Sequence, residues 1–349
     1  MPESPVTTKK FNPSDYAYAS GVVQALERHL ISAETLNQMV EAENWQAAVE
    51  FLTDTDYAGR INAGQGPEEL VKNELRRLRI LHAKLLPDDL LTGTLFVVND
   101  FQNLKYLVKS MVQRGEPQED DLIPGWLSAE ELVELVYEQP AKPRRQEAAA
   151  FTGTVQRALG EYEKWQDPAV IDYSLDRACF QYLAALFRFR KASFALGYLT
   201  LWVDLINLTT LLRLLARGEK QGWLPKAPLM DLIFLPGGAI PEAKLKTWSQ
   251  GERNEVATAL LGTKYRRWLS DGLERFLYGG SWVSIERGVE EAKITYLRRA
   301  RLVACGYEPV FAYFLAKENE CRLLQVVLKG KTFGLPPAAI RERLWGTYV

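Results

Sequence analysis

Catalytic residue types are few in this sequence, and their spacing does not favour an active site. The two histidines, His29 and His82, fall in separate helical patterns, so a histidine zinc site or a Ser-His-Asp triad is poorly supported. Gly330-Lys331-Thr332 matches the end of a phosphate-binding loop, but such a loop needs a preceding strand and a glycine where Gln325 stands. We interpret the segment as a helix end and predict no catalytic residue, no cofactor and no metal.

Two Asp-x-x-Asn pairs are the next candidates for chemistry. Asp100/Asn103 and Asp204/Asn207 each lie on one helix face at this spacing. Asparagine is neither an acid nor a base, which argues against the alternative of a general acid–base pair. We expect each pair to cap a helix or to hydrogen-bond a neighbouring loop. A third segment aligns with these two. Asn319 stands at the position of the aspartates, and Arg322 replaces the asparagine.

The composition is that of a soluble globular protein, with 349 residues, 47% of them apolar, and a net charge of −1. The length favours two or three lobes over one core, and the balanced charge argues against nucleic-acid binding. Three cysteines (Cys179, Cys305 and Cys321) fit a reducing cytoplasm, and each is expected to be buried. The longest uncharged apolar run, 192–203, is shorter than the ~20 residues of a membrane span, so membrane association would come through partners only.

Helical periodicity dominates the chain. Leucines from Leu70 to Leu85 recur at helical spacing, and Pro67 followed by two glutamates is a favourable helix start. Strand-like alternation with hairpin turns is absent from the sequence. The predicted fold class is therefore all-α.

The sequence also repeats itself about every hundred residues, which is the size of a small helical domain. Three helix starts look alike, at 30–36, 126–132 and 239–245, and three later segments correspond at 100–107, 204–211 and 319–326. The predicted domains are 1–118, a first helical repeat with a flexible N-terminus, then 119–225 and 226–349 as the second and third repeats.

Several motifs, in collinear order along nearly the whole chain, resemble one known family. They include Tyr313–Glu320, Gly334-Leu335-Pro336, Trp202–Leu208, Phe234–Gly238 and the block from Tyr18 to Leu52. As a set they resemble the C subunit of the V/A-type ATP synthases, the equivalent of the d subunit in eukaryotes.

The resemblance implies three similar helical lobes in a funnel around a pseudo-threefold axis. It also implies a non-catalytic central-rotor protein, peripheral on the cytoplasmic face of the membrane. A protein of this kind couples the central stalk to the membrane rotor ring for ATP-linked proton or sodium transport. The expected partners are therefore the central stalk subunits and the membrane rotor ring.

Each repeat carries a basic cluster in its central helix. If the lobes surround one axis, these clusters could form a positive ring that binds acidic side chains or helix C-termini of the stalk. The alternative, which we favour on sequence alone, is that they are solvated faces with local glutamate partners. The candidate partner-binding residues are Arg76, Arg77, Arg79, Arg188, Arg190, Lys191, Arg298, Arg299 and Arg301.

Two other classes of function stay open. A stand-alone helical-repeat scaffold or adaptor would share the repeat design without joining an ATPase. An enzyme would need acid, base or nucleophile residues that converge in an interlobe cleft, and the sequence shows no such set.

Overall fold

A computed structural model describes residues 12–58, 66–138, 146–221, 227–277 and 282–349. Every regular element in these ranges is a helix, which confirms the predicted all-α class there. The predicted flexible N-terminus lies almost entirely outside the described residues. The described chain forms two compact units, one of residues 88–250 and one that combines residues 12–87 with 251–349. The arrangement of three lobes in a funnel stays a prediction.

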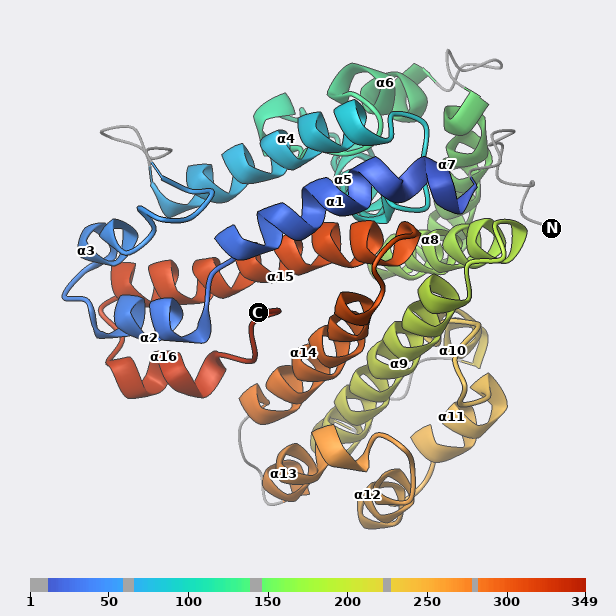
Figure 1. The fold of residues 1–349 in the computed structure, drawn as a ribbon. Coiled ribbons are helices and arrows are strands. Elements are labelled where there is room, and N and C mark those ends of the chain that lie inside the picture. Colours follow the sequence, from blue (N-terminus) through green and yellow to red (C-terminus); the bar gives the residue numbers. More distant parts are fainter. Residues whose placement is uncertain (1–11, 59–65, 139–145, 222–226, 278–281) are drawn as a thin grey trace. The chain divides into compact units, whose positions relative to one another are not determined.

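The unit of residues 88–250 is built around α8, which packs against α5, α7, α9 and α10 (Figure 1). An aromatic group of Phe101, Phe151 and Tyr182 joins three of these helices, with ring centroids 5.0–6.5 Å apart. The helices are α5 (Thr94–Val112), α6 (Ala129–Val133), α7 (Gln146–Trp165), α8 (Ala169–Phe189), α9 (Ser193–Gln221), α10 (Ala227–Ile233) and α11 (Glu242–Ser249), with a 3-10 helix η3 (Glu119–Asp121) and a π-helix η4 (Glu134–Glu138).

The second unit is built around α15, against which α1, α2, α3, α4, α14 and α16 all pack (Figure 1). The helices are α1 (Ala17–Leu26), α2 (Ala33–Glu41), α3 (Trp45–Glu50), α4 (Pro67–Leu85), α12 (Arg253–Leu261), α13 (Arg266–Leu277), α14 (Val283–Leu297), α15 (Tyr307–Thr332) and α16 (Pro337–Arg343), with 3-10 turns η1 (Pro13–Tyr16), η2 (Glu27–His29) and η5 (Arg298–Leu302). The N-terminal helices α1 to α4 therefore share a core with α15, near the C-terminus of the chain.

The predicted helix starts are confirmed by their caps. Pro67 is the first residue of α4. The Ser32 side chain accepts a hydrogen bond from the Thr35 N–H at the start of α2. Ser128 and Glu131 form a reciprocal capping box at the start of α6. These local signals determine where the helices begin.

The segment 330–332 is the end of α15, as predicted, and Gly334 takes the left-handed conformation just beyond it (φ 66°). Two other local expectations are corrected. Cys305 is exposed, because it lies in the turn between η5 and α15. The apolar run at 192–203 continues through Asp204, and Ser193–Ala216 is long and apolar enough to cross a membrane. However, 61% of its most apolar stretch is buried, as in a core helix.

Candidate partner interface

The basic cluster of α4 is divided between the surface and the interior. The Arg76 side chain is 50% exposed and pairs with Glu69 at 2.7 Å. Arg77 is directed inward, where its guanidinium binds Glu74 at 2.6 Å and Asp56 at 2.7 Å. Arg79 is half-buried near His82. The local carboxylate partners favoured on sequence are therefore present for the first two arginines.

The cluster at the end of α8 has one structural member and two surface members. The Arg190 side chain is only 6% exposed and lies 3.1 Å from the fully buried Asp89. Arg188 and Lys191 are exposed on either side of it. Phe189, between them, is 53% exposed. This end of α8 therefore presents an apolar ring between two cations.

The third cluster, in η5, has a similar division. Arg298 donates to the Thr347 carbonyl at 3.0 Å and lies 3.6 Å from Glu291. Arg299 and Arg301 are exposed and cover the rings of Tyr296 and Tyr348. Leu302, which follows them, is 89% exposed. A large apolar side chain thus accompanies exposed cations here as well.

We name these two surfaces the α8 patch (Arg188, Phe189 and Lys191) and the η5 patch (Arg299, Arg301 and Leu302). The nine candidate residues fall in both units, so their arrangement as a ring stays a prediction. The exposed Phe189 and Leu302 were not among the residues predicted from the sequence. Their signal was a large apolar residue within a basic run at the end of a helix.

A buried polar cluster where α4 meets α15 was also not predicted from the sequence. The Lys317 ammonium contacts Glu320 and lies 3.0 Å from Glu74 and 3.8 Å from Asp56. Burial alone lowers the pKa of Lys317, but Glu320 and Glu74 outweigh it and raise the net value. Burial likewise opposes ionisation of Glu74, but Arg77 and Lys317 hold its pKa below the ordinary value. The lysine therefore stays charged.

This buried cluster has the character of a structural brace. Its members lie far apart in sequence and pair across helices, which makes separation of α4 from α15 costly. The adjacent Cys321 is a poor nucleophile, because burial raises the pKa of its thiol to about 12. In the described part of the chain, no three His, Cys, Asp or Glu side chains are grouped so as to hold a metal.

The two Asp-x-x-Asn pairs bind loops, as predicted. Asp204 accepts hydrogen bonds from the Ala239 and Ile240 N–H groups at 2.9 and 3.0 Å. Asn207 exchanges two hydrogen bonds with the backbone of Leu235. We call such a pairing an amide clamp: a carboxylate on a long helix that accepts from backbone N–H groups just before a short helix.

The first repeat has the same amide clamp. Asp100 on α5 accepts from the Leu127 N–H at 3.2 Å. Asn103 exchanges two hydrogen bonds with the Ile123 backbone. In both pairs the asparagine binds the backbone of a residue that comes a few positions earlier in the sequence than the residue whose N–H the aspartate accepts. The two Asp-x-x-Asn pairs therefore bind the loop in a similar way, with Asp204 accepting from two N–H groups and Asp100 from the Leu127 N–H.

Comparisons with known proteins identify the family of this chain. The family model of the ATP synthase (C/AC39) subunit matches residues 19–343. The C subunit of the A-type ATP synthase of Methanocaldococcus jannaschii is 24% identical, covering 97% of this chain and 88% of its own. The C subunit of the V-type sodium ATPase of Enterococcus hirae is 24% identical, with 96% and 99% covered. The C subunit of the V-type ATP synthase of Thermus thermophilus is 26% identical, with 95% and 98% covered. This chain belongs to the ATP synthase (C/AC39) subunit family.

Proposed function

We propose that this protein is a non-catalytic central-rotor component of a V/A-type rotary ATPase. In this role it joins the central stalk to the membrane rotor ring, peripheral on the cytoplasmic face of the membrane, during ATP-linked proton or sodium transport. The observation that carries the proposal is the family match over residues 19–343, together with relatives that are C subunits of such ATPases. Equivalence to the eukaryotic d subunit is part of the same proposal.

The interior of the protein suits a part that transmits force. Close-packed helices resist deformation, and the Lys317 cluster and the amide clamps add hydrogen-bonded contacts between elements. Their polar groups bind each other and the backbone, so they are occupied in holding the fold. These features support a mechanical role over an enzymatic one.

The α8 patch and the η5 patch are the surfaces that we propose for partner binding. Each combines exposed cations with an exposed apolar side chain. A stalk segment with acidic residues or a helix C-terminus next to an apolar side chain would complement such a patch. Arg77, Arg190 and Arg298 are assigned to internal contacts instead.

The test of the interface is a charge reversal confined to exposed residues. The double variant Arg188→Glu/Lys191→Glu should weaken binding of the central-stalk subunits by about tenfold and reduce the salt dependence of binding. Arg157→Glu/Lys164→Glu is the matched control, because it reverses two exposed charges on α7 of the same unit. Equal binding by the two variants across a salt series would remove the α8 patch from the interface.

The test of the function itself is deletion of the gene followed by assays on inverted membrane vesicles. The proposal predicts loss of ATP-driven ion uptake, and restoration by the full-length chain. A stand-alone scaffold or adaptor, the alternative, predicts unchanged ion uptake after deletion.

A further inference from the structure

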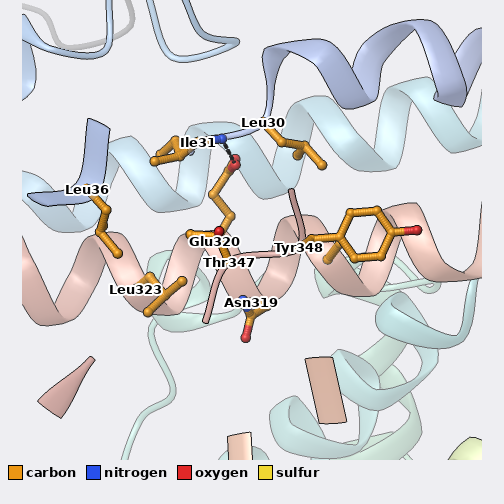
Figure 2. Close-up of a pocket in the computed structure, with 9 residues that line it drawn as sticks. Leu30, Ile31, Leu36, Asn319, Glu320, Leu323, Thr347 and Tyr348 are labelled. Atoms are coloured by element: carbon orange, nitrogen blue, oxygen red, sulfur yellow. Dashed lines mark hydrogen bonds between the residues drawn. The ribbon is translucent and has the colours of Figure 1, made fainter. Parts of the chain in front are cut away.

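The third repeat departs from the Asp-x-x-Asn pattern, yet a carboxylate still reaches the equivalent backbone N–H. Ile31 precedes the cap of α2, as Leu127 and Ile240 precede the starts of α6 and α11. The Ile31 N–H donates to Glu320 Oε2 at 2.5 Å (Figure 2). Asn319, the residue that aligns with Asp100 and Asp204, accepts instead from Trp345 Nε1 at 2.6 Å.

We infer that Glu320 is the carboxylate of a third amide clamp, and that this clamp joins the last repeat to the first. The first two clamps hold a helix start that follows the clamping helix along the chain. The third holds α2, near the N-terminus, on α15, near the C-terminus. A carboxylate of the third repeat thereby binds the backbone just before the start of α2 in the first repeat. This inference does not depend on the proposed function.

The shift by one residue has a steric reason. A Cβ atom at Gly125 would lie 1.9 Å from Asp100 Oδ1, and one at Gly238 would lie 2.2 Å from Asp204 Oδ1. An aspartate therefore makes the clamp where a glycine lies two residues before the N–H group that it binds. In the third copy, the residue two positions before Ile31 is His29. Glu320, one residue later on α15 and one methylene longer, reaches the N–H of Ile31 in place of an aspartate.

The replacement of asparagine by Arg322 has a related explanation. In the first two copies the asparagine satisfies the backbone of an irregular segment, at Ile123 and Leu235. The corresponding segment of the third copy is η2, where the Leu30 N–H already donates to the Glu27 carbonyl. No asparagine is needed there, and Arg322 pairs with Glu290 at 2.9 Å.

The C-terminal tail supports the third clamp. Trp345 binds Asn319, the Gly346 N–H donates to Glu291 at 2.7 Å, and Arg298 binds the Thr347 carbonyl. Thr347 and Tyr348 line a small cavity beside Glu320 and Ile31 (Figure 2). The tail thus lies against the third clamp. In that clamp, unlike the other two, the helices on its two sides, α15 and α2, are far apart along the chain.

Amide hydrogen exchange of the full-length protein tests this assignment. Glu320→Gln should speed exchange at Ile31 by about tenfold, because a neutral acceptor replaces a charged one, and leave Leu127 and Ile240 unchanged. Glu320→Asp keeps the charge but shortens the side chain, and should have the same effect. Asp100→Asn should speed exchange at Leu127 and leave Ile31 unchanged.

Glu74→Gln is the matched control, because it removes a carboxylate from the same Lys317 cluster without touching Ile31. The inference predicts faster exchange at Ile31 in the Glu320 variants than in Glu74→Gln. Equal exchange at Ile31 in all three variants would overturn it, because the effect would then come from the ion cluster. Unchanged exchange at Ile31 in Glu320→Gln and Glu320→Asp would overturn it as well.

Discussion

Replacing Asp204 with asparagine tests the amide clamps with almost no change in side-chain volume. The Asp204 side chain is fully buried, and its two oxygens accept from the Ala239 and Ile240 N–H groups. An asparagine retains one acceptor oxygen, but its NH₂ group faces a backbone N–H. One donor of the loop before α11 therefore loses its partner in the interior.

The expected loss follows from these two contacts. A hydrogen bond to a charged acceptor contributes about 1.5–3 kcal/mol, and a buried donor left unpaired costs about 1–3 kcal/mol. The Asp204→Asn variant should therefore lose about 3 kcal/mol of unfolding free energy. With a slope of about 2 kcal/mol per molar urea, the midpoint should fall by about 1.5 M.

Urea titration followed by tryptophan fluorescence and far-ultraviolet circular dichroism measures this midpoint. Asp231→Asn is the control, because it makes the same chemical change at an exposed carboxylate of the same unit. A midpoint for Asp204→Asn equal to that of Asp231→Asn would refute the reasoning, because the buried carboxylate would then contribute nothing to the loop.

Three further outcomes are expected. Gly238→Ala should lower the urea midpoint because its Cβ would meet Asp204, whereas Gly160→Ala, with open space around it, should be neutral or stabilising; equal effects would contradict the close approach. Burial, with a smaller effect of Arg79, lowers the pKa of His82 from 6.5 to about 3. As pH falls below about 6.5, the imidazole therefore takes up a proton in the unfolded chain but not in the folded one. The free energy of unfolding should then decline by about 1.4 kcal/mol per pH unit. His82→Gln should lessen this decline, and an unchanged pH profile would contradict it. Under native conditions a thiol reagent should label Cys305 and spare Cys321, and rapid labelling of both would show that the α15 core is open.

Local signals in the sequence predicted the elements well. Pro67 and Ser128 fixed helix starts because the cap and the first turn involve neighbouring residues only. The Asp-x-x-Asn spacing predicted loop binding, because both side chains lie on one helix face and asparagine suits backbone groups. These inferences needed no knowledge of distant contacts.

Contacts between distant segments could not be predicted in the same way. The Lys317 cluster joins Asp56 and Glu74 to a helix more than two hundred positions later, and nothing local marks such a pairing. Likewise, the repeat in the sequence aligns Asn319 with the two aspartates, whereas Glu320 is the residue that binds the Ile31 N–H. The contact of Glu320 with the Ile31 N–H joins segments at opposite ends of the chain, which only the fold reveals. For the same reason the common core of the N-terminal helices with α15 was not foreseen.

The most direct measurement of the central claim is purification of the tagged full-length chain from detergent-solubilised native membranes, followed by mass spectrometry of what accompanies it. A rotor component predicts the catalytic, stalk and membrane-ring subunits of one ATPase together, in fixed ratios and with ATP hydrolysis in the same fraction. Recovery of the chain without any of those subunits, from membranes in which the ATPase itself is intact, would contradict the claim.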